Sequence, residues 1–233
     1  MPVIRHFGFD RGEAFHRAAA AWVEGGSVAA EPRPAATVLL VRDGAAGPEV
    51  FVQQRAATMA FAPSMVVFPG GRVDPTDAAA GLPEAEVREV ADLMGVEAER
   101  AWPLVAAAVR EVEEECGVRL APGVLVPRGR WLTPRLEPRR YDTWFFAARM
   151  PDDQVAKGTT SETTAERWGH PVELLRLGES GELRLMPPTM FMLEALARFD
   201  AVEAYLADRP SVALVEPILV EGPDGYALET TLP

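Results

Sequence analysis

Residues Arg110 to Val118 read REVEEECGV, a run of nine residues with four glutamates. Like charges three or four positions apart on a helix repel one another, at a cost of about 0.2–0.5 kcal/mol per pair. On a helix, Glu111, Glu114 and Glu115 fall at i, i+3 and i+4, so their carboxylates share one face. Mg²⁺ and Mn²⁺ prefer such oxygen ligands. The spacing therefore indicates a metal site, and the alternative is an acidic helix face that only meets water.

A near-copy lies upstream, where residues 88–96 read REVADLMGV. It keeps two acids but has Leu93 at the position that corresponds to Glu115. An apolar side chain cannot bind a metal ion, so residues 110–118 are predicted to be the working copy and Glu113 a solvated bystander. The upstream copy is predicted to be an ordinary amphipathic helix whose inward-packing residues are Val87, Val90 and Leu93.

Two elements must position the glutamates. A helix is predicted from Trp102 to Cys116, because its apolar residues recur every three or four positions, and Gly117 suits a left-handed helix end. Upstream, Pro69, Gly70 and Gly71 form strong turn punctuation. A glycine turn can bring backbone amides and carbonyls close to a metal ion or a phosphate.

The remaining pattern alternates strands and helices. Strands are predicted at residues 36–43, 49–56, 64–71 and 140–150. Helices are predicted at residues 11–24, 84–94 and 171–177, with one long or two short helices at 187–209. The first two strands form a hairpin with a loop of about five residues, and residues 212–221 and 225–232 form a terminal hairpin. This order predicts a mixed α/β domain with helices packed on a sheet.

Composition narrows the function classes. A chain of 233 residues suggests one large domain, or one domain with appendages, and its net charge of −12 argues against sequence-independent nucleic-acid binding. A small anionic substrate stays compatible, because a divalent cation inverts the local charge. The single cysteine excludes an intrachain disulfide and fits a cytoplasmic location. We find neither a signal-peptide pattern nor an apolar run of about 18 residues, so no membrane association is expected.

Gly71 followed by residues 110–118 resembles the Nudix box. That box is a glycine, five residues, a glutamate, seven residues, then Arg-Glu-aliphatic-any-Glu-Glu-any-Gly-aliphatic. The second half matches at every fixed position. The first half departs, because Asp77 stands in the place of the box glutamate and 32 residues separate it from Arg110. The resemblance implies an insert at about residues 78–102, and leaves Asp77 open between a replacement for the box glutamate and a loop acid.

The resemblance implies a Nudix-type α/β/α sandwich with a mixed sheet and a loop-helix-loop catalytic motif. The domain would span residues 33–233, after an N-terminal helix and linker at 1–32. Segments 33–44, 68–77, 131–146 and 185–196 are similar to the coenzyme A-cleaving branch of the peroxisomal mammalian type, which also carries an insertion inside the box.

Members of this superfamily are metal-dependent hydrolases of nucleoside diphosphate-linked substrates, so the resemblance implies Mg²⁺ or Mn²⁺ as cofactor. It implies coenzyme A or an acyl-CoA as the substrate, cleaved to 3′,5′-ADP and a phosphopantetheine. ADP-ribose, NADH or nucleoside triphosphates are the alternatives within the class. Outside it, the alternatives are a Nudix-fold binding or regulatory domain without turnover, or a structural protein. Dimers are frequent in the family, so a homodimer is compatible.

The resemblance also assigns roles. Glu111, Glu114, Glu115 and the Gly71 carbonyl would bind the metal, and Arg110 would pair with a box carboxylate and fix it.

The general base would be a box glutamate such as Glu115, or a loop glutamate after the box, for which Glu162 and Glu166 are the candidates. Substrate contacts would come from Gly70, Gly71 and Arg55, and Arg55, near Phe61, could instead pair with an acid. The aromatic residues Tyr141, Trp144 and Phe145 line either a base pocket or the core.

Overall fold

The computed structural model describes residues 3–7, 12–26, 28–59, 62–158, 160, 162–222 and 225–232. The chain divides into two compact units. The box unit comprises Ala35–Gly129 and Trp144–Val212, and the terminal unit comprises Met1–Pro34, Arg130–Thr143 and Ala213–Pro233. The N-terminal segment therefore groups with two later segments of the chain.

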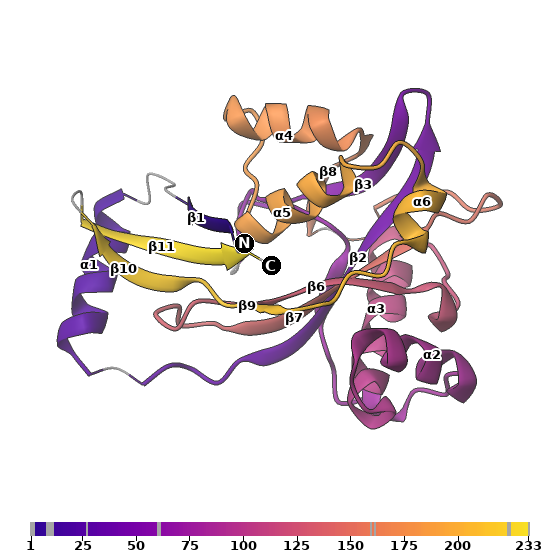
Figure 1. Ribbon diagram of the computed structural model, residues 1–233, viewed down its shortest axis with the longest axis horizontal. Coiled ribbons are helices and arrows are strands. Elements are labelled where there is room, and N and C mark those ends of the chain that lie inside the picture. The colour runs from indigo at the N-terminus through magenta and orange to yellow at the C-terminus, as the bar shows by residue number, and fades with distance from the viewer. Residues whose placement is uncertain are drawn as a thin grey trace. The chain divides into compact units, whose positions relative to one another are not determined.

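Strands and helices follow one another in runs along the chain (Figure 1). The strands are β1 Val3–Phe7, β2 Arg33–Gly44, β3 Gly47–Arg55, β4 Val66–Val67, β5 Gly70–Arg72, β6 Val126–Leu132, β7 Tyr141–Arg149, β8 Thr163–Gly169, β9 Leu214–Val215, β10 Ile218–Gly222 and β11 Gly225–Leu232. The α-helices are α1 Gly12–Glu24, α2 Glu84–Met94, α3 Ala98–Cys116, α4 Pro171–Glu179, α5 Pro187–Leu196 and α6 Val202–Ala207. The short 3₁₀ helices are η1 Asp77–Ala79 and η2 Pro122–Val124.

The larger sheet has the strand order β4-β3-β2-β7-β6-β9, with β5 paired to β2 and β8 paired to β3. It is mixed, because β2 and β3 run antiparallel whereas β6 and β9 run parallel. A three-stranded sheet in the order β1-β11-β10 belongs to the terminal unit. The predicted mixed α/β fold is confirmed.

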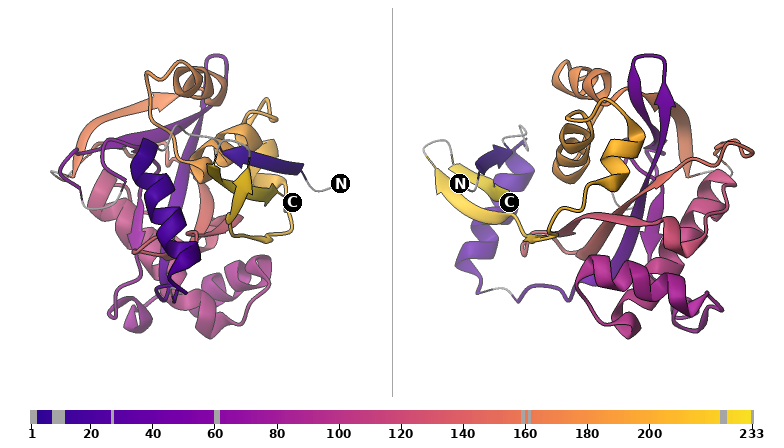
Figure 2. Two further views of the ribbon diagram at one scale, coloured as in Figure 1. Left: turned by 90° about the vertical axis from the view of Figure 1, so that its left-hand side faces the viewer. Right: turned by 45° about the vertical axis from the view of Figure 1, so that its right-hand side comes forward.

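Alternate residues of the box unit's strands are buried on opposite faces of the sheet. In β2, Val38 and Leu40 join a core cluster with buried side chains of α2 and α3, whereas Leu39 and Val41 point to the other face. All four side chains are inaccessible to solvent. A sheet that is apolar on both faces must be covered on both. Helices α2 and α3 lie on one side of the sheet and α4 and α5 on the other (Figure 2), which gives the α/β/α layers that the resemblance implies.

Local signals predicted several boundaries well. Helix α2 has the predicted bounds, and Gly95 and Gly117 end α2 and α3 in the left-handed conformation, at φ 67° and 68°. Segment 187–209 forms two helices, α5 and α6, and the terminal hairpin is present with Gly222 opposite Gly225. Residues 223–224 of its turn lie outside the described residues.

Four predictions were wrong in detail. The first hairpin turn has two residues instead of five, because Gly44 already pairs with Gly47. The strand predicted at 64–71 is split into β4 and β5, with Pro69, which cannot donate to a ladder, between them. Helix α3 begins at Ala98 and runs through Pro103. In α2, Val87 and Val90 are buried as predicted, but the side chain of Leu93 is 38% exposed.

Strands β1, β6 and β8 were not predicted, because their sequences lack a strong alternation of apolar and polar residues. Residues 78–102, the predicted insert region, contain most of η1, all of α2 and the first turn of α3. The indole N–H of Trp102 donates to the Ala80 carbonyl at 3.0 Å, and α2 packs on α3.

No helix in the described part of the chain combines the length and the hydrophobicity that a membrane span requires.

Candidate active site

The last two turns of α3 carry the glutamates at three different depths. The Glu115 side chain is buried, Glu111 is largely buried and Glu114 is exposed, with 58% of its side chain accessible. Val112 and Cys116 are buried in the core, as predicted. The helix face that carries the three glutamates is therefore partly covered, with Glu111 and Glu115 facing the protein and Glu114 facing solvent.

The glycine turn lies directly against these glutamates. The Gly70 N–H donates to Glu115 Oε2 at 2.9 Å. A Cβ built on Gly71 would lie 2.3 Å from Glu111 Oε1, and one on Gly70 would lie 2.4 Å from the Ala36 carbonyl oxygen. Gly70 also has φ 155°, which L side chains rarely adopt. Gly70 therefore has no room for a side chain against Ala36 and Thr37 of β2, and a side chain at Gly71 would have to displace the Glu111 carboxylate.

We expect Gly71→Ala to lower kcat/KM by about 10²-fold, because its methyl group must displace the Glu111 carboxylate from the turn. The control is Gly81→Ala, since a Cβ on Gly81 meets nothing within 4 Å. Steady-state kinetics and thermal melts of both variants provide the measurement. Equal activity of the two variants would show that the approach of Gly71 to Glu111 has no role in catalysis.

Arg110 joins the start of the predicted insert to the glutamate helix. Its Nε and Nη2 donate to Asp77 Oδ1 and Oδ2 at 2.9 and 3.0 Å, and Nη2 also donates to the Arg72 carbonyl at 3.0 Å. Its Nη1 donates to Glu111 at 2.9 Å and to Glu114 at 3.0 Å. Asp77 is only 3% exposed and accepts a further hydrogen bond from the Asp74 N–H at 2.7 Å. Asp77 therefore occupies the carboxylate position that pairs with the box arginine, despite the 32 intervening residues.

Burial makes this site electrostatically costly without a cation. The pKa of Glu115 is raised to about 7, chiefly by burial and also by the nearby Glu111 charge, while the hydrogen bond from the Gly70 N–H and the Arg55 charge act to lower it. The pKa of Glu111 is also raised, chiefly by burial, although Arg110 opposes this. The hydrogen bonds to Asp77 raise the pKa of Arg110 above its already high value, so it stays charged. Two adjacent carboxylates are thus held where ionisation is unfavourable, which is the electrostatic condition that a bound cation relieves.

The donor set fits a hard divalent cation, because it consists of carboxylate oxygens beside a glycine turn that no side chain blocks. As the side chains lie, no three His, Cys, Asp or Glu residues in the described ranges are grouped to share one ion. Glu111 and Glu114 are both turned to Arg110, and Glu115 to the Gly70 N–H. The predicted convergence of three carboxylates would therefore require Glu114 to leave Arg110.

The post-box glutamates lie on or beside a strand. Glu166 belongs to β8, where it pairs with Gln53 of β3, so its placement in a loop was wrong. Its carboxylate accepts a hydrogen bond from the Gly158 N–H. Glu162 is exposed just before β8, and its carbonyl accepts from the Ala56 N–H at 2.7 Å. Arg55 ends β3 as predicted and lies close enough to lower the pKa of Glu115, whereas Phe61 lies outside the described residues.

Other candidates belong to the core. Trp144 and Phe145 are 3% and 6% exposed, which favours the core alternative for both, and Tyr141 is half-buried in the terminal unit. Burial raises the pKa of the Cys116 thiol, so Cys116 is a poor nucleophile. Glu113 is exposed and pairs with Arg119 at 2.7 Å, as expected of a bystander.

Sequence reasoning missed one supporting residue, Gln53. It is 2% exposed on β3, and its Nε2 contacts the Glu115 carbonyl at 3.4 Å and Cys116 Sγ at 3.7 Å. It therefore supports the end of α3 where Glu115 is placed. A polar residue inside the apolar run EVFVQQRA was the available signal, because a buried amide requires a partner.

The chain is similar to proteins of one superfamily. The Caenorhabditis elegans protein "Putative nudix hydrolase 7" is 29% identical over 198 residues, which cover 77% of this chain and 66% of that protein. The chain therefore spans slightly less than two thirds of that relative. No family model matches the chain.

Solved structures agree. The crystal structure of a NUDIX hydrolase from Alicyclobacillus acidocaldarius matches with a TM-score of 0.67 and 27% identity, covering 79% of this chain and 99% of that one. A C. elegans Ap4A hydrolase matches with a TM-score of only 0.44 and 15% identity, which is too distant to bear on function. In its box motif, its α/β/α fold and the two stronger similarities, the chain is similar to Nudix hydrolases.

Proposed function

We propose that the protein is a metal-dependent pyrophosphohydrolase that cleaves a nucleoside diphosphate-linked substrate. The observation that carries this proposal is the pair of buried carboxylates, Glu111 and Glu115, held against a glycine turn that cannot carry side chains. A solvated acidic surface would have neither this burial nor this backbone approach. A bound cation would offset both the carboxylate charges and the phosphate charges of a substrate.

The reaction is hydrolysis of a phosphoanhydride. Water adds to one phosphorus, the bridging P–O bond breaks, and two phosphate monoesters form. Glu111, Glu114, Glu115 and the Gly71 carbonyl are the residues that would hold Mg²⁺ or Mn²⁺, which would stabilise charge on the phosphate oxygens.

The chain's own residues divide the remaining work. Glu115 is the box-glutamate candidate for the base that accepts the proton of the attacking water. Glu166 is the second candidate for this base. Arg110 positions Glu111 through a guanidinium that Asp77 fixes, and Arg55, whose charge lowers the pKa of Glu115, would contact phosphate.

For the substrate we propose coenzyme A or an acyl-CoA, on the strength of the four sequence segments that resemble that branch. The test is a panel of coenzyme A, acetyl-CoA, ADP-ribose, NADH and nucleoside triphosphates with Mg²⁺ or Mn²⁺, with products identified by mass spectrometry. Release of 3′,5′-ADP with a phosphopantetheine would support the proposal. Release of AMP with ribose 5-phosphate would identify ADP-ribose, not coenzyme A, as the substrate. Binding without turnover across the whole panel would contradict the proposed hydrolysis.

We expect Glu114→Gln to reduce hydrolysis by at least about 10²-fold, because it removes one proposed cation ligand. The fold should remain intact, since 58% of the Glu114 side chain is exposed, and the free energy of unfolding should stay within about 0.5 kcal/mol of wild type. Turnover assays and urea denaturation measure the two effects. Wild-type turnover in Glu114→Gln would remove Glu114 from the site.

A further inference from the structure

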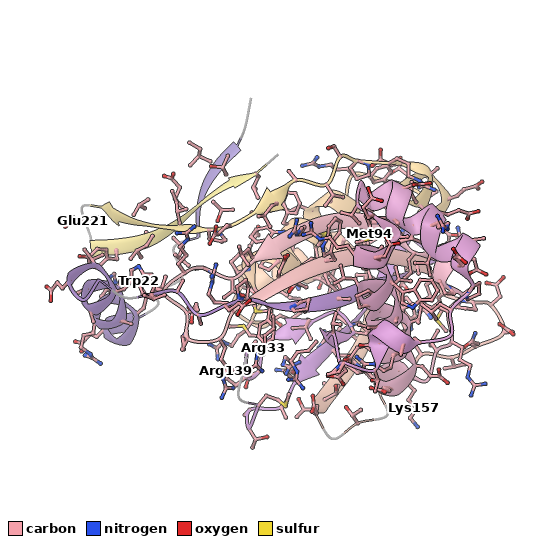
Figure 3. The ribbon with its side chains drawn as sticks, turned by 90° about the horizontal axis from the view of Figure 1, so that it is seen from below. Trp22, Arg33, Met94, Arg139, Lys157 and Glu221 are labelled. Atoms are coloured by element: carbon pink, nitrogen blue, oxygen red, sulfur yellow. The ribbon has the colours of Figure 1, made fainter. Side chains whose placement is uncertain are left out.

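A cavity lies within the terminal unit. Its volume is about 210 Å³, and it is lined by Trp22 of α1, by Arg135 and Leu136 between β6 and β7, and by Glu216, Pro217, Ile218 and Leu219 around the start of β10. All seven residues belong to the terminal unit, and none belongs to the proposed hydrolytic site. Trp22 lies on α1 (Figure 3). Nothing in the proposed hydrolysis uses this cavity.

The cavity's walls and size suit one small ring. Trp22 and Leu136 are half-buried, Pro217 is buried, and Ile218 keeps 54% of its surface exposed. An apolar cavity of about 150 Å³ can hold benzene, so 210 Å³ admits a ring with a short substituent. An indole wall favours an aromatic ring, because offset or edge-to-face contacts add to the burial of apolar area.

At the cavity, two described arginines pair with the one carboxylate of Glu216. Glu216 Oε1 accepts from Arg140 Nη2 at 2.8 Å and lies 3.4 Å from Arg135 Nε. Arg140 is 7% exposed, and its other donors reach the carbonyls of Thr133 and Ala30 at 3.0 Å each. Arg140 therefore neutralises Glu216 and is fully engaged. The Arg135 side chain is 71% exposed, and within the described residues its two terminal nitrogens meet no acceptor.

From this cavity, which Trp22, Leu136 and Pro217 line together with the paired Arg135 and Glu216, we propose that the terminal unit binds a small aromatic carboxylate. Trp22 and Leu136 would contact the ring, and the terminal nitrogens of Arg135 would donate to the carboxylate in the forked geometry that arginine favours. The proposal is independent of the hydrolytic function, because it concerns other residues and another ligand.

The test is a titration of the full chain with benzoate, followed by ¹H–¹⁵N NMR of the tryptophan indole N–H signals. The chain has five tryptophans, and Trp22→Phe assigns the signal of Trp22. We expect a saturable shift of that signal with a Kd of about 1 mM, a usual affinity for so small a ligand. No saturable shift up to about 20 mM, or a shift confined to other tryptophans, would overturn the proposal.

Charge selectivity is tested with two ligands of matched shape, benzyl alcohol and benzylamine. Both should bind at least about fivefold more weakly than benzoate, because neither offers a carboxylate to Arg135. Benzylamine binding as tightly as benzoate would instead assign the cavity to cations through Glu216, and would overturn the proposal.

The matched variants are Arg135→Ala and Arg139→Ala, two exposed arginines of one loop of which only the first lines the cavity. Arg135→Ala should weaken benzoate binding about tenfold, and Arg139→Ala should leave it unchanged. Arg135→Ala keeps the pair between Arg140 and Glu216, so it should fold, which the NMR spectrum verifies directly. Equal effects of the two variants would show that Arg135 acts only through general positive charge, and would overturn its assignment as the carboxylate-binding residue.

Discussion

Glu115→Gln is expected to reduce hydrolysis by about 10²–10⁴-fold, the usual contribution of a general base. The amide of the substituted side chain would keep an oxygen for the Gly70 N–H, which lies 2.9 Å from the present carboxylate, so the turn should stay in place. The variant would lose the charge that a cation needs and the basicity that the attacking water needs. The measurement is kcat/KM on the best substrate of the panel, at saturating Mg²⁺.

The same substitution should stabilise the metal-free protein, because it removes a buried charge. The pKa of Glu115 is raised from 4.5 to about 7, so between these values the folded state binds more protons than the unfolded state. Stability therefore falls as the pH rises from 4.5 to 7, and the cost is complete above pH 7. With EDTA at pH 8, we expect the free energy of unfolding of Glu115→Gln to exceed that of wild type by about 2–3 kcal/mol. Near pH 4.5 the two free energies of unfolding should be equal.

The matched control is Glu113→Gln, a glutamate of the same helix whose carboxylate is exposed and pairs with Arg119. It should change neither activity nor stability by more than about 0.5 kcal/mol. A loss of stability in metal-free Glu115→Gln, or full activity in that variant, would contradict the description of Glu115 as a buried carboxylate that awaits a cation.

The sequence was sufficient where the chemistry is local. Gly95 and Gly117 end their helices as predicted, because a left-handed residue after a helix is a short-range requirement. The glutamates share one helix face for a similarly local reason, because positions i, i+3 and i+4 of a helix lie on one side. Their different depths could not be predicted, because the burial of Glu115 and the exposure of Glu114 depend on the glycine turn and strand β3, which are distant in sequence.

Long-range pairings explain the other failures. Strand β8 has mostly exposed residues and forms by pairing with β3, so its sequence carries little apolar alternation, and Glu166 was assigned to a loop. The role of Asp77 stayed open for a similar reason. Its contact with Arg110 depends on how the 32 residues between them fold back, which no motif spacing determines.

Arg110→Ala is expected to lower the free energy of unfolding by about 2–4 kcal/mol, because it leaves the Asp77 carboxylate buried with the Asp74 N–H as its one partner among the described residues. The near-copy provides a control at the matching position. Arg88 also pairs with an acid, Glu84 at 2.5 Å, but both side chains are more than half exposed, at 64% and 67%. Arg88→Ala should therefore cost less than about 0.5 kcal/mol. Urea denaturation of both variants gives the two values.

The comparison separates two explanations of the repeated phrase Arg-Glu-Val. If its arginine matters only as a helix-surface charge, the two variants will lose equal stability, and the pairing of Arg110 with Asp77 has no special weight. If the buried partner decides, the double variant Arg110→Met with Asp77→Asn should be more stable than Arg110→Ala alone, because the buried charge of Asp77 is then no longer left without its guanidinium partner. Its hydrolysis should nevertheless stay low, because Glu111 loses the guanidinium that now holds it at 2.9 Å. Stability would thus recover without activity, which would identify Arg110 as the residue that positions Glu111.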